Sequence, residues 1–165
     1  ILEVGVWRGG SAGLIGTALA TFKLERKLWL ADTFRGVVKA GPRDDYYKGG
    51  EHADTSAEVV EEHLRRLGIT NYALLAGIFP EETAQLVDSE RVALCHVDVD
   101  VYQSAKDVVD WVWPKLPVGG LVVYDDYGFY GCEGVTALVE EEITRDGGMV
   151  IQNLNGHAVI VKTEL

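Results

Sequence analysis

Short apolar runs alternate along the chain with stretches in which apolar residues recur at helical spacing. The first run, Ile1–Val6, predicts a strand, and Lys27–Ala31 predicts a second one. Between them we expect a helix that is capped by Ser11 and presents one apolar face, made of Leu14, Ile15, Ala18, Leu19 and Phe22. This alternation is typical of a parallel sheet assembled from β-α units.

The middle of the chain repeats the alternation. Thr55 and Glu58 have the spacing of a capping box, and the helix that they predict ends at Gly68. The apolar side chains of that helix are Val60, Leu64 and Leu67. A strand, a short helix and a central strand buried on both faces should follow, over Tyr72–Ala76, Glu81–Leu86 and Val92–Asp98.

The last third predicts two more helices and three strands. One helix is ended by Pro114 and Pro117, and its apolar positions are Val108, Val109, Val112 and Leu116. Gly119 and Gly120 then turn the chain into a strand at Leu121–Tyr124. The next helix carries Val135, Leu138, Val139 and Ile143.

Two final strands are predicted at Met149–Gln152 and His157–Val161. The short turn Asn153–Gly156 joins them, so they should form an antiparallel hairpin. The seven strands together predict an α/β fold, a doubly wound and mostly parallel seven-stranded sheet with a C-terminal antiparallel hairpin. Residues 33–54 are polar and longer than an ordinary connection, which makes them a candidate lid or binding loop.

Composition narrows the class of protein. The 165 residues, 47% of them hydrophobic, suffice for one buried core, so we expect a single domain over residues 1–165. A net charge of −11 argues against nucleic acid or an anionic membrane as a partner, and no apolar run is long enough for a membrane span. Cys95 and Cys132 form no disulfide or zinc pattern, which favours a cytoplasmic protein.

The first predicted strand leads into a glycine-rich turn, Glu3–Ser11, that opens a helix. Glycines there let backbone N–H groups approach a ligand, although tight strand-to-helix turns need glycine anyway. Asp32, at the end of the second strand, is placed to bind both hydroxyls of a ribose, or else merely caps a turn. Glu3 would repel a pyrophosphate but suits a cationic group, which favours S-adenosylmethionine over NAD.

Two pairs of aspartates follow two of the predicted strands. Asp98 and Asp100 end the central strand, and Asp125 and Asp126 come directly after the strand at Leu121–Tyr124. An Asp-Asp pair alone is usually a turn, but two pairs at equivalent strand ends meet at the ligand edge of the sheet. Clustered carboxylates repel one another, and a cation such as Mg²⁺ relieves that repulsion. The sequence therefore predicts an acidic, metal-binding reaction site.

Five segments in order resemble the macrocin O-methyltransferase family, over nearly the whole chain. They are Glu3–Ser11, Asp32–Gly36, Asp98–Tyr102, Leu116–Gly120 and Asp125–Gly128. The resemblance implies a Rossmann-like class I methyltransferase that depends on S-adenosylmethionine and a metal and methylates sugar hydroxyls of macrolides and other natural products. Members usually carry an N-terminal lid, a segment that covers the active site and makes subunit contacts. We expect that lid to be absent here, and a homo-oligomer is possible.

The resemblance also assigns roles. It implies that Glu3, Gly5, Arg8, Gly9, Gly10 and Ser11 surround the methionine part of the cofactor, that Asp32 holds its ribose, and that Gly77 and Phe79 lie near its adenine. A core aromatic is the simpler interpretation of Phe79. Asp98, Asp125 and Asp126 would be the metal ligands and Asp100 the general base, with the division between Asp98 and Asp100 left open.

Two rival functions use the same residues. A methyltransferase for catechol-like phenols would need an aromatic-lined pocket, for which Tyr46, Tyr47, Trp111 and Trp113 are candidates, although the two tryptophans are more simply residues packed on the sheet. A non-catalytic module that binds a nucleotide-like ligand, or a receiver domain that uses Asp125 and Asp126, is the rival from another class.

Overall fold

Seven strands form one sheet in the computed structural model, which describes residues 1–153 and 156–164. The strands are β1 Leu2–Val4, β2 Leu28–Asp32, β3 Tyr72–Ala76, β4 Leu94–Val97, β5 Leu121–Tyr124, β6 Gly148–Gln152 and β7 Ala158–Lys162. Their order across the sheet is β3-β2-β1-β4-β5-β7-β6. β1 to β5 pair in parallel, and β7 runs antiparallel to both β5 and β6. The predicted fold class and C-terminal antiparallel pair are confirmed.

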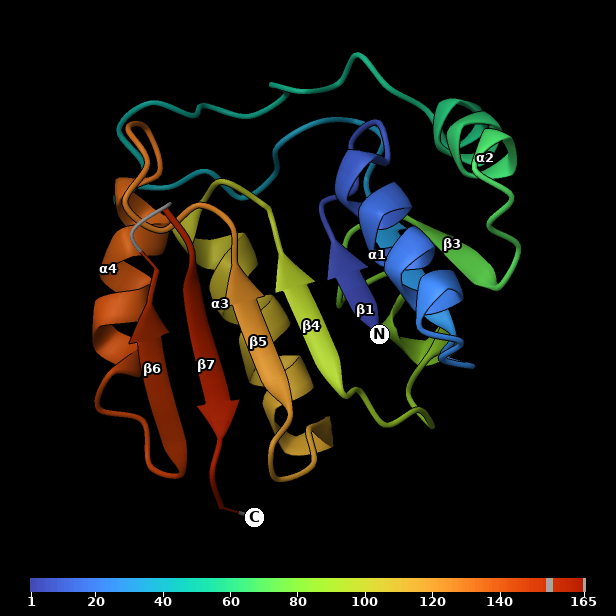
Figure 1. Cartoon of the computed structure of the whole chain (residues 1–165). Coiled ribbons are helices and arrows are strands. Elements are labelled where there is room, and N and C mark those ends of the chain that lie inside the picture. Colours follow the sequence, from blue (N-terminus) through green and yellow to red (C-terminus); the bar gives the residue numbers. More distant parts are fainter. Residues whose placement is uncertain (154–155, 165) are drawn as a thin grey trace.

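Helices cover both faces of the sheet (Figure 1). They are α1 Gly10–Thr21, α2 Ala57–Arg66, α3 Tyr102–Val112 and α4 Glu133–Glu142, with short 3₁₀ turns η1 Ala84–Leu86 and η2 Trp113–Lys115. α1 and α2 lie in front of the β1–β2–β3 half, and α3 and α4 lie behind the other half. Residues 33–54 form no helix or strand and pass over the edge where the parallel strands end. No described helix is long and apolar enough to cross a membrane.

The predicted apolar face of α1 is wrong for most of its residues, although Ile15 packs against a buried hydrophobic cluster. Leu14 and Phe22 are more than 70% exposed, whereas the buried positions are Ala12, Gly13 and Gly16. Small residues are needed because the segment that follows α2 lies close by, and a Cβ on Gly16 would come within 2.5 Å of the Ile69 side chain. Glycines that leave room for side chains from α2 and the segment after it, and not a stripe of large apolar residues, therefore position this helix.

Both predicted N-caps also differ. Gly9, with φ 83°, precedes the first residue of α1, and the Ser11 hydroxyl donates to Glu3 instead of capping the helix. α2 is capped by Ser56, whose hydroxyl accepts from the Val59 N–H at 3.4 Å. The Thr55 hydroxyl donates to the Trp7 carbonyl. In each case the hydroxyl predicted to cap the helix hydrogen-bonds instead to a residue from another part of the fold.

Several element ends fall inside the predicted ranges. β1 stops at Val4 because Gly5 turns with φ 87°. β4 ends at Val97, so Asp98 and Asp100 lie beyond the strand, and Asp100 itself has φ 65°. α3 ends at Val112, and Pro114 lies in η2. The residues between β6 and β7 include Leu154 and Asn155, which fall outside the described part of the chain.

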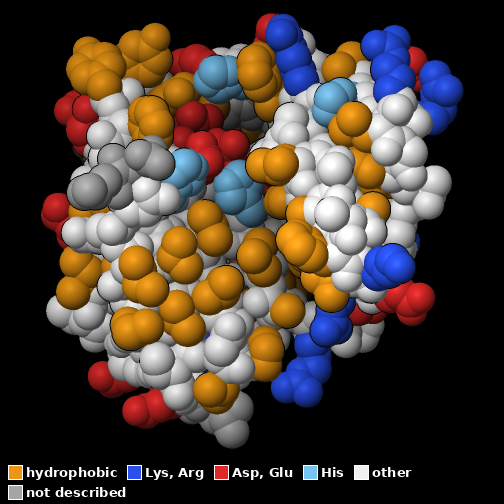
Figure 2. All heavy atoms as spheres, in the orientation of Figure 1, with side chains coloured by type: hydrophobic (Ala, Val, Ile, Leu, Met, Phe, Trp, Pro, Cys, Tyr) orange, Lys and Arg blue, Asp and Glu red, His pale blue; other side chains and the backbone are white. Residues whose placement is uncertain are grey.

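The front face of β5, β7 and β6 is apolar and has no helix over it in Figure 1. Strand register places Leu121, Val161 and Met149 in one row and Val123, Val159 and Ile151 in the next. Met149 and Ile151 are about half exposed, and Figure 2 shows hydrophobic side chains gathered over these strands. The opposite face carries the fully buried Val122, Tyr124 and Ile160. The hydrophobic core of this half therefore lies against α3 and α4.

We expect Gly16→Val to destabilise the protein by about 1–3 kcal/mol, because its side chain would overlap Ile69. Ala18→Val, at an exposed position of the same helix, is the matched control and should cost about 0.5 kcal/mol, the helix-propensity difference alone. Urea unfolding measures the free energy of unfolding of both variants. Equal losses in the two variants would contradict the close helix contact.

Candidate active site

A cavity of 340 Å³ opens where β1, β2, β4 and β5 end, roofed by residues from the 33–54 segment. Figure 2 shows it as a hollow with acidic side chains inside. The predicted site residues that line it are Gly5, Asp32, Gly77, Phe79, Asp98, Asp100, Asp125 and Asp126. Residues far apart in sequence thus share one pocket, because the parallel strands all end at this edge.

The glycine-rich turn presses directly against the end of β4. Gly5 has φ 87°, and a Cβ there would lie 1.5 Å from the Asp98 carbonyl oxygen. The Asp98 N–H donates to the Val4 carbonyl at 2.9 Å, which extends the pairing of β1 and β4 by one residue. Glycine at this position is therefore required for the turn and the first aspartate pair to meet.

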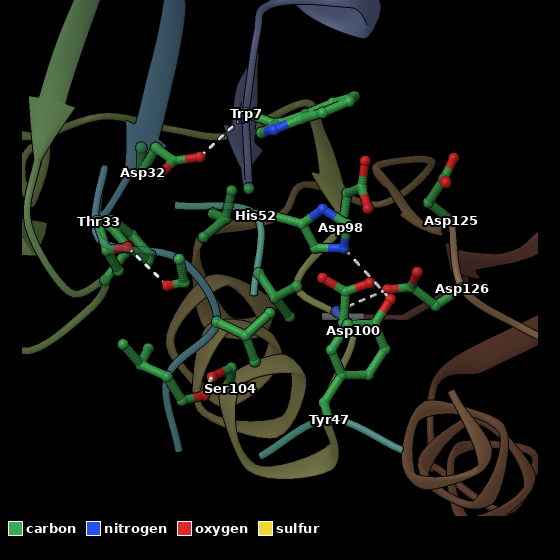
Figure 3. A pocket seen from close by; sticks show the side chains of 18 of the residues that line it. Trp7, Asp32, Thr33, Tyr47, His52, Asp98, Asp100, Ser104, Asp125 and Asp126 are labelled. Atoms are coloured by element: carbon green, nitrogen blue, oxygen red, sulfur yellow. Dashed lines mark hydrogen bonds between the residues drawn. The ribbon is translucent and has the colours of Figure 1, made fainter. Parts of the chain in front are cut away.

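The carboxylate of Asp32 organises that turn from the neighbouring strand. One oxygen accepts from the N–H groups of Val6 and Trp7, each at 2.8 Å, and the other accepts from the Phe34 N–H at 2.7 Å (Figure 3). Each carboxylate oxygen has two lone pairs, so one acceptor position remains on the oxygen bound by Phe34. Asp32 lies at the pocket and also holds the backbone that surrounds it.

The other residues predicted around the methionine group do not line the cavity. Glu3 is fully buried beneath the turn, where one of its oxygens accepts from Ser11. The Arg8 side chain lies on the surface, paired with Asp54 and stacked over Trp7 at 4.5 Å. Gly9 and Gly10 form the start of α1.

Three carboxylates form an acid cluster, defined here as Asp98, Asp125 and Asp126. Oxygen atoms of the three lie within 4.8 Å of one another. Burial, followed by the charges of Asp126 and Asp125, raises the pKa of Asp98 to about 8. Burial, followed by the charge of Asp100, raises the pKa of Asp126 to about 7. These shifts express the cost of holding several carboxylates together away from water.

A divalent cation fits this donor set. Mg²⁺ binds carboxylate oxygens in preference to nitrogen or sulfur, and the acid cluster offers one oxygen from each of three side chains. The repulsion that raises the pKa values of Asp98 and Asp126 would be relieved by such a charge. No lysine or arginine among the described residues lines the cavity to relieve it instead.

Asp100 faces the same pocket from beyond the acid cluster. Its N–H donates to Asp126 at 2.9 Å, which holds the left-handed backbone in place. Burial raises the pKa of the Asp100 carboxyl, and a hydrogen bond with Tyr47 opposes that shift. The Tyr47 hydroxyl also lies 3.4 Å from Nε2 of His52. A tyrosine and a histidine from residues 33–54, the covering segment, therefore lie beside this aspartate (Figure 3).

Two histidines that the sequence analysis did not assign contact the acid cluster. The Nε2 atoms of His96 and His157 lie 3.3 and 2.9 Å from one oxygen of Asp125. Burial acts to lower the pKa of His96, but hydrogen bonds to Asp125 and Glu3 outweigh it and raise the pKa to about 10. Hydrogen bonds from His96 and His157 hold the pKa of Asp125 below its usual range. The pairing of β1 with β4 would have indicated this role, because it places His96 directly beside Glu3.

The segment after β3 forms the far wall of the cavity. Gly77 and Phe79 both line it, and Phe79 is also packed edge-on against Trp111, with ring centroids 4.9 Å apart. Trp113 lies elsewhere, beneath Arg145 and Lys162, and neither tryptophan lines the pocket. The interpretation of both tryptophans as packing residues is confirmed.

Residues 1–149 match the Macrocin-O-methyltransferase (TylF) family. The chain belongs to the macrocin O-methyltransferase family. The demethyldecarbamoylnovobiocin O-methyltransferase of Streptomyces niveus is 33% identical over 139 residues, which cover 77% of this chain and 52% of that protein. The 8-demethyl-8-(2,3-dimethoxy-alpha-L-rhamnosyl)-tetracenomycin-C 4'-O-methyltransferase of Streptomyces olivaceus is 32% identical over 142 residues, 80% and 54% of the two chains.

The fold is similar to that of a solved O-methyltransferase. The structure of the O-methyltransferase NovP superimposes with a TM-score of 0.82 at 26% identity, over 99% of this chain and 72% of NovP. The chain spans about half the length of the two sequence relatives. The sequence-based recognition of the family is confirmed, and with it a class I methyltransferase fold.

In this family member, Gly5→Ala should move the glycine-rich turn away from Asp98, because the new Cβ overlaps the Asp98 carbonyl. We expect a loss of about 1–3 kcal/mol of stability and a fall in S-adenosylmethionine affinity of at least about tenfold, which is about 1.4 kcal/mol. Gly41→Ala is the matched control, since Gly41 does not line the cavity and the nearest atoms lie 3.9 Å from its Cβ position, an ordinary van der Waals distance. Thermal unfolding and calorimetry measure both variants, and an unaffected Gly5 variant would contradict the required contact.

Proposed function

We propose that the protein transfers a methyl group from S-adenosylmethionine to a sugar hydroxyl of a natural product, with a divalent cation held by Asp98, Asp125 and Asp126. The observation that carries the proposal is the position of these three carboxylates in one pocket with the glycine-rich turn. Family membership supports the reaction class, and the rhamnosyl group in the name of one relative supports the acceptor class.

The cofactor would occupy the end of the cavity formed by the turn, Asp32 and the segment after β3. Asp32 keeps one free acceptor position for a ribose hydroxyl, and Gly77 and Phe79 offer backbone and an aromatic edge for the adenine. S-adenosylmethionine supplies the methyl group on a positively charged sulfur. The buried negative charges of this pocket favour such a cation over the pyrophosphate of a dinucleotide.

The acceptor would lie at the acidic end. A bound divalent cation supplies Lewis acidity there, which lowers the pKa of an alcohol that is otherwise a poor nucleophile. Asp100 accepts the hydroxyl proton, and its raised pKa makes it a stronger base than an ordinary aspartate. The Tyr47 hydroxyl bonds the same carboxylate and sets its direction. Asp98, assigned to the cation, is the alternative base.

Asp125→Asn should weaken Mg²⁺ binding at least tenfold and reduce methyl transfer at least a hundredfold, because it removes a charge from the acid cluster without changing shape. S-adenosylmethionine binding should change by less than about threefold, which is under 1 kcal/mol. Calorimetry with each ligand and a labelled-methyl assay measure these. Asp45→Asn, at an exposed aspartate of the covering segment, is the control. Full activity of the Asp125 variant, or of the wild type in excess chelator, would refute the metal role.

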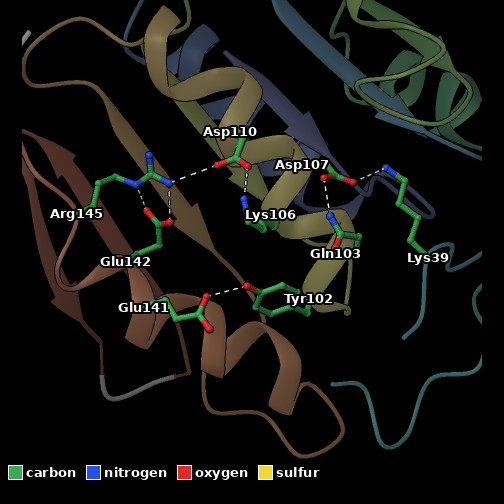
Figure 4. Close-up of polar contacts among 9 residues, drawn as sticks. All are labelled: Lys39, Tyr102, Gln103, Lys106, Asp107, Asp110, Glu141, Glu142 and Arg145. Carbon is green, nitrogen blue, oxygen red and sulfur yellow. Dashed lines mark hydrogen bonds and ion pairs between the residues drawn. The ribbon is translucent and has the colours of Figure 1, made fainter. Parts of the chain in front are cut away.

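Charges around the pocket favour an acceptor sugar that is already joined to a neutral aglycone. The basic residues of the covering segment have partners: Arg35 pairs with Glu82, and Arg43 with Glu141. Lys39 pairs with Glu81 and with Asp107, and Figure 4 shows the pair with Asp107. Lys48 donates to the Asp44 carbonyl. A nucleoside diphosphate sugar would bring two phosphate charges to a protein of net charge −11 with no free cation among the described residues that line the pocket.

Aromatic side chains at the pocket mouth add an apolar surface for that aglycone. Tyr46 packs edge-on against Tyr47 and Tyr130, and Phe129 and Tyr130 line the cavity. Phe129 and Tyr130 are 52% and 89% exposed. Such a rim suits a flat or apolar group held beside the sugar. A phenol acceptor would use the same surface, so the catechol-type alternative is tested directly.

An acceptor panel with labelled cofactor should give transfer to a glycoside with an apolar aglycone, at a kcat/KM at least tenfold above that for the same sugar on a nucleoside diphosphate. Raising the salt concentration should narrow the difference, because it screens repulsion of the phosphates. A catechol is the third acceptor. Preference for the nucleotide sugar or the catechol would contradict the proposed acceptor class.

A further inference from the structure

We propose that His96 and His157 act as a clamp on Asp125, holding one carboxylate oxygen so that the other faces the cation. The clamp rests on the proposed function, since it orients a ligand for the proposed metal. Its members are not catalytic residues: both histidines act through Asp125.

Strand register produces the clamp. His96 on β4 pairs with Glu3 on β1 and with Val123 on β5, so all three side chains share one face of the sheet. Asp125 lies two residues beyond Val123 and therefore continues along that face. On the other side, the antiparallel pairing of Tyr124 with Ala158 leaves His157 opposite Asp125. His96 on β4 and His157, which directly precedes β7, thus approach Asp125 from the two sides of β5.

The two histidines bind the same atom. The N–H groups at Nε2 of His96 and of His157 approach Oδ1 of Asp125 at 3.3 and 2.9 Å. Among the described residues no side chain hydrogen-bonds to Oδ2, which is the oxygen left for a cation. Without the clamp, an aspartate whose side chain is 35% exposed would exchange rotamers and present either oxygen or neither.

His96 is itself fixed from behind. Its Nδ1 lies 3.1 Å from Glu3, which is fully buried and also accepts from Ser11 in the first turn of α1. The ring therefore cannot turn without breaking a buried contact. A series of hydrogen bonds thus connects Ser11 at the start of α1, through Glu3 on β1 and His96 on β4, to Asp125. It gives a role to Glu3, a buried glutamate that does not line the cavity.

Two substitutions of His96 separate the clamp from a space-filling role. The amide of glutamine takes the place of Nε2 and can still reach Asp125, whereas that of asparagine takes the place of Nδ1 and can reach only Glu3. Mn²⁺ binding, followed by electron paramagnetic resonance and calorimetry, should weaken by about 10- to 100-fold in His96→Asn. In His96→Gln it should change by less than about threefold, which is under 1 kcal/mol.

His157 gives an independent pair at a partly exposed position, in case a change at His96 prevents folding. His157→Ala should weaken Mn²⁺ binding, and His157→Gln should restore it. S-adenosylhomocysteine affinity without metal should be the same in all variants, and His63→Gln, on α2, is the control substitution.

The outcomes separate the clamp from the function on which it rests. If wild-type protein binds Mn²⁺ and the asparagine and glutamine variants lose affinity equally, or not at all, the clamp is refuted and the metal site stands. If wild-type protein binds no Mn²⁺, the proposed metal function fails, and the clamp fails with it.

Discussion

The site depends on the contact between Gly5 and the backbone of Asp98. Here the turn after β1 crosses the end of β4 with no room for a side chain, since a Cβ would lie 1.5 Å from a carbonyl oxygen. β1 and β4 are neighbours in the sheet, so this crossing brings the glycine-rich turn and the first aspartate pair to the same pocket. The cofactor end and the acidic end of the cavity are thereby set at a fixed separation by backbone alone.

Electrostatics adds a second constraint, because the pocket concentrates negative charge in a place with little water. The effect on the pKa differs among the three carboxylates of the acid cluster. Hydrogen bonds from His96 and His157 lower the pKa of Asp125, whereas burial, followed by the charges of neighbouring aspartates, raises the pKa values of Asp98 and Asp126. An oxygen-rich site that is left partly uncompensated by its own side chains has a higher affinity for a divalent cation, since binding removes the repulsion.

Patterns that depend on strand ends could be predicted from sequence, and those that depend on tertiary partners could not. The aspartates after β4 and β5 were expected at one edge, and oxygens of Asp98, Asp125 and Asp126 lie within 4.8 Å of one another. Asp32, by contrast, was expected to bind a ribose. Its carboxylate also accepts hydrogen bonds of 2.7 to 2.8 Å from three backbone N–H groups, and these bonds could not be predicted without the folded turn. His96 received no role from the sequence, because a single strand does not reveal which neighbour faces it.

The predicted face of α1 failed for a related reason. Periodicity assumes that a helix buries its largest apolar residues, but α1 approaches the end of α2 so closely that glycine is required, and Leu14 and Phe22 face outward. This arrangement places the start of α1 near Glu3, where Ser11 contacts the buried carboxylate that fixes His96. A larger residue at Gly13 or Gly16 would push the helix outward and with it Ser11. The small-residue face of α1 therefore serves the orientation of Asp125, which follows β5, two strands across the sheet from β1.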